Sequence, residues 1–258
     1  MLAKAEGLPV PSRPQSEAER RGANQRVTAN SGYTAPVFIG HFAVGFASKR
    51  AAPRASLGVL MAAPLFLDLL WPIFLIAGIE SVRIEPNPNP FLTLDLHDFP
   101  WSHSLVTSLA WSAVFAAAFW AATRYGRGAV VLAMGVFSHW VLDFVTHRPD
   151  MPLYPGSARS VGLGLWNFPP VTMAIEIAMF VVAIAIYVRA TRAINWRGAV
   201  ALWSLVVLLA VFYAMTCFGP PPSSVDFIKY GALTGWLFVP WAWWIDRNRE
   251  MRVGRATA

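Results

Sequence analysis

The sequence predicts an all-α fold: a polytopic integral membrane helical bundle with about six transmembrane helices plus a short N-terminal apolar helix. Three observations support this prediction: an apolar composition, a series of long uncharged stretches, and an uneven distribution of basic residues. Of the 258 residues, 56% are hydrophobic and 14% are charged, whereas soluble domains have about 25% charged residues. These charges are too few to cover a water-soluble surface. The 12 tryptophans and 17 phenylalanines are typical of a lipid-facing surface with aromatic belts.

The long apolar stretches predict where the helices lie. A helix needs about 20 mostly apolar residues to span a bilayer. Six stretches meet or nearly meet this requirement, at roughly 56–79, 102–123, 129–146, 170–188, 199–218 and 227–245. A seventh, Pro36 to Ala47, would cover less than about 20 Å at about 1.5 Å per residue, so we expect it to be re-entrant, interfacial or partly buried. Residues 35–246 are thus predicted to form one membrane-embedded helical domain, and residues 38–176 contain its candidate metal site.

The basic residues predict the orientation of this domain. With six spans and residues 1–55 on one side, 17 lysines and arginines fall on that side and 4 on the other. Since lysine and arginine concentrate in cytoplasmic loops, both termini are predicted to be cytoplasmic. This distribution accounts for the net charge of +7, so no nucleic-acid partner is expected. Residues 1–34 lack an apolar run and are expected to form a disordered tail, and residues 247–258 a basic cytoplasmic tail.

Several ionisable side chains lie inside the predicted membrane segments. Such groups are costly in a bilayer, so each is a functional candidate. They are Asp68, His139, Asp143 and Glu176, with His41 in the short segment and His103 at the mouth of a span. Counted at about 1.5 Å per residue, those in the full-length spans fall in the same outer half of the membrane although they come from different helices. This common depth predicts a shared polar cavity.

The spacing of these residues is typical of a metal site. His139 and Asp143 are four residues apart, and His147 follows four residues later, so they share one helix face. Such a pair can offer a nitrogen and an oxygen to one ion, and zinc takes these ligands at about 2.0–2.2 Å. We expect Asp68 and His103 to complete a set of four ligands. The single cysteine excludes a cysteine-based zinc site.

Each candidate also has a structural interpretation. His139 and Asp143 could form a hydrogen-bonded pair within one helix, and Asp68 could link helices through polar contacts. Glu176 could serve mainly as a hydrogen-bond partner of a ligating histidine. The residues expected near the outer surface could instead be exposed to solvent. They are His97, Asp98, His103 and His147. Because so many ionisable groups fall in one layer, a single shared site is the favoured interpretation.

Four short motifs occur in a fixed order. They are GH at Gly40–His41, APLFLD ending at Asp68, WSHS containing His103, and SHWVLD from Ser138 to Asp143. Over roughly residues 38–155, their order and spacing resemble the YdjM-like family of membrane-bound metal-dependent hydrolases. The resemblance implies an integral metalloprotein of the bacterial inner membrane with hydrolase activity. The chain departs from the family pattern after Pro64, where Asp68 stands alone instead of within an Asp-x-Asp-His run.

The order of histidines and aspartates is also distantly similar to that of the zinc-dependent phospholipase C and single-strand nuclease superfamily. By that likeness, one zinc would be held by Asp68, His103, His139 and Asp143, with His41 and His147 near additional ions. That superfamily carries a further pair of a histidine and a carboxylate downstream, and this chain has no histidine after His147. One or two metals are therefore expected.

The predicted function is metal-dependent hydrolysis of an ester or phosphoester in a small molecule or a lipid, through a metal-activated water. The expected cofactor is a divalent metal, zinc or manganese, and Glu176 or Asp98 would be the general base. The alternative is a transporter or metal-binding channel that uses the same buried cluster. Transporters usually carry broken helices in both halves of an internal repeat, whereas most polar residues here lie in the first two-thirds of the chain. A third hypothesis is a structural protein with a relict site.

Overall fold

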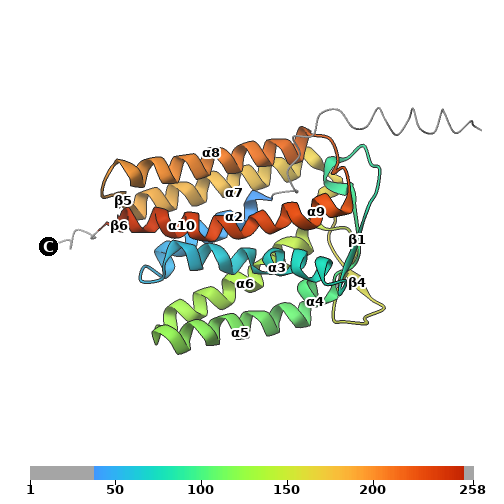
Figure 1. Cartoon of the computed structure of the whole chain (residues 1–258), viewed down its shortest axis with the longest axis horizontal. Helices are drawn as coiled ribbons and strands as arrows, with labels where there is room; N and C mark the ends of the chain where they lie inside the picture. Colours follow the sequence, from blue (N-terminus) through green and yellow to red (C-terminus); the bar gives the residue numbers. More distant parts are fainter. Residues whose placement is uncertain (1–37, 253–258) are drawn as a thin grey trace, which may run out of the picture. The chain divides into compact units, whose positions relative to one another are not determined.

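Five long helices make up nearly half of residues 38–252, the part of the chain that the computed structural model describes. They are α3 (Leu57–Ile76), α5 (Leu105–Thr123), α6 (Gly126–Thr146), α7 (Pro169–Ala190) and α8 (Trp196–Phe218). Each is long and apolar enough to cross a membrane, and the helices run side by side (Figure 1). The all-α membrane bundle is confirmed, and so are five of the six predicted spans.

The sixth predicted span is interrupted. Residues 225–247 form α9 (Val225–Ala232), the 3-10 helix η3 (Leu233–Leu237) and α10 (Phe238–Arg247), which follow one path along the bundle (Figure 1). Gly231 and Gly235 lower the helix propensity at this junction. Pro240 has no N–H to donate to the carbonyl of Trp236, as a continuous helix would require. These residues explain why an apolar stretch of spanning length does not form one α-helix.

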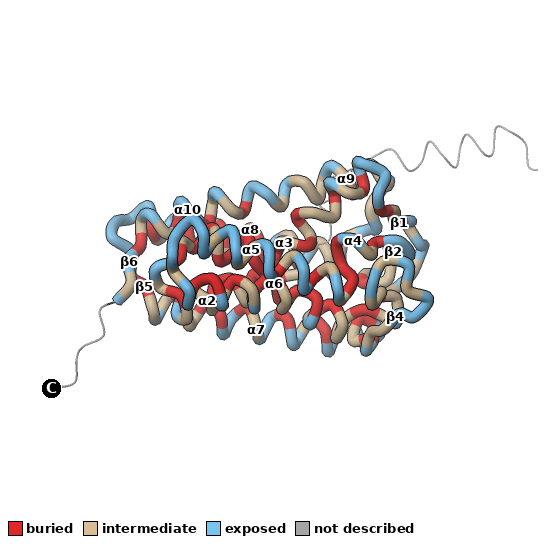
Figure 2. Tube along the Cα trace, turned by 90° about the horizontal axis from the view of Figure 1, so that it is seen from below, coloured by how far each residue is buried: buried red, intermediate tan, exposed pale blue. Residues whose placement is uncertain are grey.

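The short helix α2 (Ile39–Ala51) lies buried within the bundle (Figure 2). It has 13 residues and packs against α3, α6 and α7. It ends at Ala51, four residues beyond the predicted Ala47. At Gly45 a Cβ atom would lie 2.7 Å from Sδ of Met61 and 3.2 Å from the carbonyl oxygen of Leu60. Glycine therefore allows α2 and α3 to approach closely, and this brings the start of α2 to the candidate site.

Short strands that the sequence did not reveal occur at both ends of the bundle. At one end, β1 (Ser81–Ile84) pairs antiparallel with β2 (Leu94–Asp98), and β3 (Met151–Pro152) with β4 (Ser160–Val161). The short helices η1 (Pro90–Leu92), α4 (Pro100–His103) and η2 (Leu165–Asn167) belong to the connections at this end. At the other end, β5 (Thr191–Ala193) pairs antiparallel with β6 (Arg249–Met251). Part of the predicted C-terminal tail is thus a paired strand, while residues 1–37 and 253–258 lie outside the described part.

Basic residues are concentrated at the end that carries β5 and β6. In the described part of the chain, 11 lysines and arginines lie at that end and 4 lie elsewhere: Arg83, Arg148, Arg159 and Lys229. The first and last described segments are at opposite ends. Phe38 stacks on Trp166 just before α7, at 4.9 Å between ring centroids, whereas the N–H of Arg252 donates to the carbonyl of Ala190 at the end of α7. The predicted location of the N-terminal tail lies outside these residues.

Candidate metal centre

The structure brings five of the six candidate metal ligands together. They are His41 on α2, Asp68 on α3, His103 on α4, and His139 and Asp143 on α6. Four of these side chains are buried. The side chain of Asp68 is 47% exposed because it faces a cavity. His41, His103 and Asp143 line the same cavity, whereas His139, which is 1% exposed, does not.

Four of the inward-facing atoms lie at nearly equal distances. Nε2 of His139 is 3.2 Å from Nε2 of His103, 3.2 Å from Oδ2 of Asp143 and 3.7 Å from Oδ1 of Asp68. Nε2 of His103 is 3.5 Å from Oδ1 of Asp68 and 3.8 Å from Oδ2 of Asp143. In a tetrahedral zinc site with bonds of about 2.1 Å, ligand atoms lie about 3.4 Å apart. Five of the six separations among these atoms are therefore close to the spacing of such ligands, and Asp68 and Asp143 fall in two groups of three candidate ligands that share His139.

Hydrogen bonds on the outer side of two histidines set their tautomers. Nδ1 of His139 lies 2.7 Å from the carbonyl oxygen of Pro64, which can only accept, so Nδ1 carries the hydrogen. Nδ1 of His103 lies 2.6 Å from Oγ of Ser102, whose hydroxyl donates to Oε2 of Glu80 at 2.7 Å. With Glu80 ionised, the single hydrogen of Ser102 is already used, and Nδ1 of His103 must donate. Both neutral rings then direct the lone pair of Nε2 inward.

When both rings are neutral and Glu80 is ionised, all four inward atoms are hydrogen-bond acceptors. Two imidazole lone pairs face two carboxylate oxygens, and the set contains no donor. Acceptors held 3.2–3.8 Å apart repel one another unless a proton or a cation lies among them. Histidine nitrogens and aspartate oxygens are ligands that zinc takes, and a histidine held by a second hydrogen bond is the usual arrangement around a metal. These residues fit a divalent metal ion.

A close approach of α6 to α3 makes this arrangement possible. At Gly135 a Cβ atom would lie 3.1 Å from Cβ of Ala63. Because Gly135 is one turn before His139, α6 can bring that ring within reach of the Pro64 carbonyl. Pro72, four residues after Asp68, has no N–H, so the carbonyl of Asp68 lacks its helical donor. The backbone as well as the side chains of α3 is therefore polar at the level of the site.

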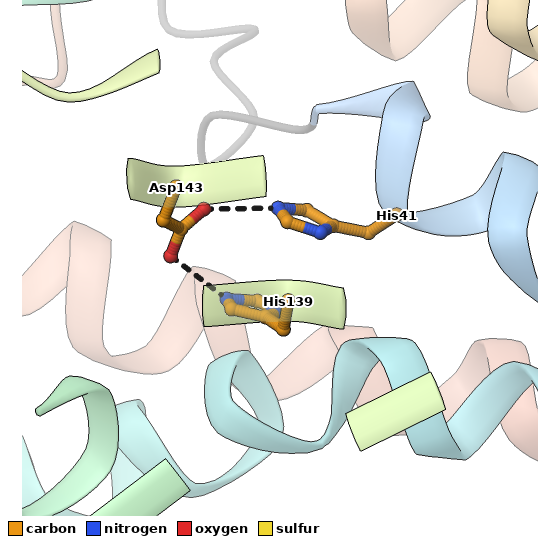
Figure 3. Close-up of side chains that lie close together, drawn as sticks. All are labelled: His41, His139 and Asp143. Carbon is orange, nitrogen blue, oxygen red and sulfur yellow. Dashed lines mark ion pairs between the residues drawn. The ribbon is translucent and has the colours of Figure 1, made fainter. Parts of the chain in front are cut away.

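His41 occupies a different position from the other two histidines. Its Nε2 lies 3.2 Å from Oδ1 of Asp143, so the Asp143 carboxylate bridges His41 and His139 with one oxygen toward each ring (Figure 3). The two rings stack at 4.0 Å between centroids. Within the described part of the chain, Nδ1 of His41 has no hydrogen-bond partner. His41 is therefore held by stacking and by Asp143, and its tautomer is not fixed from outside.

The sequence matches the family of YdjM inner membrane proteins over residues 37–218, which include all five clustered residues. This match covers more than half of the chain. The chain belongs to the YdjM inner membrane protein family. No curated protein and no solved structure gives a match. The predicted family is thereby confirmed, and the five membrane-spanning helices agree with an inner membrane protein.

One residue of this YdjM-family site was missed in the sequence. Glu80 is 3% exposed and accepts hydrogen bonds from the backbone N–H of Trp101 at 2.8 Å and of Ser102 at 2.7 Å. Burial raises the pKa of the Glu80 carboxyl above its usual range. Glu80 accepts the hydrogen bond of the Ser102 hydroxyl, and the oxygen of that hydroxyl contacts Nδ1 of His103. The only sequence signal is a lone carboxylate directly after the predicted end of a span at residue 79.

Three other predicted site residues of this YdjM-family protein lie outside the cluster. Nδ1 of His147 lies 2.9 Å from Oδ1 of Asp150, and the His147 ring is part of the cavity wall. Oε2 of Glu176 accepts from the N–H of Ile39 at 3.0 Å, at the start of α2. Asp98 is exposed on β2 and accepts from the Ser81 hydroxyl at 3.4 Å. The structure thus places Glu176 against backbone and Asp98 in an outer hairpin.

Proposed function

We propose that this YdjM-family protein is a membrane-bound, metal-dependent hydrolase that acts on an ester or a phosphoester. The observation that supports the proposal is the convergence of two imidazole nitrogens and two aspartate oxygens, with five of their six separations between 3.2 and 3.8 Å. The metal is divalent, with zinc favoured by the ligand types and manganese as the alternative. When bound, such an ion supplies Lewis acidity and lowers the pKa of a water beside it.

The residues of the chain would have different roles at this site. Asp68, His103, His139 and Asp143 would hold the ion. A catalytic zinc site keeps one position open, and the half-exposed Asp68 gives the cluster a side that faces the cavity. Glu176 positions the start of α2, and with it His41, by accepting the N–H of Ile39. We assign no step to Asp98.

We also propose that the end bearing β5 and β6 is cytoplasmic. It carries 11 of the described lysines and arginines, and such residues concentrate on the cytoplasmic side. The C-terminal end of the described chain would then be cytoplasmic, and the cluster would lie in the outer half of the inner membrane.

Replacing Asp143 with asparagine tests the metal site, because this change keeps the shape of the side chain and removes its charge. We expect the purified wild-type protein to retain a divalent ion, and Asp143→Asn to lose it while keeping its helical content. Hydrolysis of a panel of ester and phosphodiester substrates with Zn²⁺ or Mn²⁺ should fall by more than the about 10–100-fold typical of residues that only support ligands.

The matched control is Asp226→Asn, at an exposed aspartate on α9, and it should bind metal and hydrolyse substrate like the wild type. A wild-type protein without metal, or an Asp143→Asn variant that behaves like it, would contradict the proposal. A transporter would instead move an ion or solute across vesicles and cleave no substrate under either metal.

A further inference from the structure

A cavity of about 530 Å³ extends from the cluster to the interrupted helix. Its charged and imidazole side chains are on the side of the cluster, and its other polar groups are the hydroxyls of Thr93 and Thr234 and the indole N–H groups of Trp71, Trp166 and Trp241. The rest of the wall is apolar and includes Leu65, Leu69, Leu208, Phe212, Leu237 and Phe238. A polar occupant would leave its hydrogen-bonding groups unpaired against this wall. The lining therefore suits a ligand with a polar head at the cluster and an apolar remainder.

The cavity also lies deep along the spanning helices. Leu208 is ten residues from the end of α8 at Phe218, or about 15 Å at 1.5 Å per residue. Leu65 is eleven residues from the end of α3 at Ile76, or about 16 Å. Because the hydrocarbon core of a bilayer is about 30 Å thick, the cavity reaches about half of that depth. The bilayer beside the cavity at this depth is hydrocarbon and not water.

The interrupted helix forms the wall of the cavity on one side. Gly231, Ala232 and Gly235 line the cavity and have little or no side chain to fill it. Leu237 lines the same cavity and is 63% exposed, and its neighbour Trp236, which does not line the cavity, is 41% exposed. The element η3 is thus at the surface of the molecule as well as in the cavity wall. The indole N–H of Trp236 donates to the carbonyl of Leu69 at 3.0 Å and so holds η3 against α3 beside the cavity.

We infer that the cavity binds one apolar chain of a bilayer lipid, which enters past η3 and places an ester or phosphoester group at the cluster. The volume lies within the range of about 300–1,000 Å³ for sites that enclose one small ligand. The head-group chemistry rests on the proposed hydrolase function, whereas the binding of the chain does not. Hydrolysis breaks the bond between the acyl carbon or phosphorus and the ester oxygen. The hydroxyl of water then joins the carbon or phosphorus, and its remaining proton joins the leaving oxygen.

Photolabelling tests where the lipid chain binds. The full-length protein is reconstituted in vesicles of phosphatidylethanolamine and phosphatidylglycerol that contain a trace of phosphatidylglycerol with a diazirine in one acyl chain. After photolysis, peptide mass spectrometry should find label on the cavity face of α8 and on η3. Leu208→Trp should lower this labelling at least about tenfold, because its indole fills part of a cavity sized for one ligand.

Val207→Trp is the matched control, since Val207 is the neighbouring residue on α8 and is 60% exposed outside the cavity. It should leave the cavity labelling unchanged, and both variants should retain metal. Asp143→Asn should still be labelled, because binding of the chain does not need the metal.

Equal labelling of Leu208→Trp and the wild type would overturn the inference and leave the hydrolase proposal standing. The inference would also be overturned, with the hydrolase proposal still standing, if unlabelled phosphatidylglycerol failed to displace the probe and an apolar transmembrane peptide displaced it. If the cavity is labelled but the metal-loaded protein cleaves no ester or phosphoester, the proposed function fails, while the binding of a lipid chain is supported.

Discussion

At the scale of single residues, the three clustered histidines differ in what holds their outer nitrogen. His139 donates to a backbone carbonyl, which no side-chain substitution removes. His103 depends on Ser102 and Glu80, and Nδ1 of His41 has no partner within the described residues. The tautomer of His103 is therefore the one that a conservative substitution can change, because its partners are side chains.

Glu80→Gln should reverse that tautomer. The amide nitrogen would donate to the Ser102 hydroxyl, which would then donate to Nδ1 of His103 and leave the ring hydrogen on Nε2, where it faces the cluster. We expect metal affinity to fall by about 10–100-fold, as for other residues that orient a ligand. Competition with a fluorescent chelator measures it. Glu85→Gln, at an exposed glutamate paired with Arg148 at 3.1 Å, is the control. Wild-type affinity in Glu80→Gln would show that Glu80 does not set the tautomer.

The residues that meet in the cluster were foreseeable because burying an ionisable group is costly. Asp68, His139 and Asp143 lie in stretches that are otherwise apolar, so the sequence alone indicates that they need partners. Glu80 is buried by the chain segment around Trp101, and a loop carries no periodic pattern that would indicate such a contact. The roles of Glu176 and Asp98 were assigned by residue type, and only the tertiary structure shows what each carboxylate faces.

At the scale of elements, the start of α2 depends on one carboxylate. Oε2 of Glu176 accepts from the N–H of Ile39, which would otherwise be a buried donor without a partner at a helix start. The amide oxygen of a glutamine can accept the same bond. Alanine offers no acceptor. The two substitutions therefore separate a structural role of Glu176 from a catalytic one.

Glu176→Gln should keep thermal stability and metal affinity close to those of the wild type, and its turnover should fall only a few-fold. Glu176→Ala should lower the free energy of unfolding by about 0.5–2 kcal/mol, the cost of losing a helix cap. Thermal unfolding in detergent and steady-state kinetics measure these effects. If Glu176 is instead the general base, Glu176→Gln will lose about 10²–10⁴-fold in rate with metal still bound.

Apolar length predicts a continuous helix only where the backbone has no breaks. Apolar length predicts five of the spans correctly, and α7 and α8 end within a few residues of their predicted limits. It failed at residues 225–247, because hydropathy does not register that Gly235 and Pro240 weaken an α-helix. The strands have only two to five residues each, too few for an alternating pattern. The interruption that escaped prediction is the one that forms the wall of the cavity.

At the scale of the whole molecule, the charges and the site lie at different ends. Asp68, His103 and Asp143 are nearer the end that carries β1 to β4, which has few basic residues. The opposite end holds the α5–α6 and α7–α8 connections (Figure 1). There, Lys49 at the end of α2 forms an ion pair with Asp246 of α10 at 2.6 Å. By the positive-inside rule, this uneven distribution of basic residues predicts an orientation in the membrane, which can be measured.

Cysteine labelling in intact cells tests that orientation. The one native cysteine, Cys217, is buried and should give little background. Ala158→Cys places a thiol in the exposed connection between β3 and β4. Gly126→Cys places one at the first residue of α6, next to its connection with α5, where a Cβ meets no heavy atom within 4 Å. Because basic residues are concentrated at the second site, we expect a membrane-impermeant maleimide to label Ala158→Cys in intact cells. Gly126→Cys should react only after the inner membrane is disrupted, and the reverse pattern would place the cluster of candidate metal ligands on the cytoplasmic side.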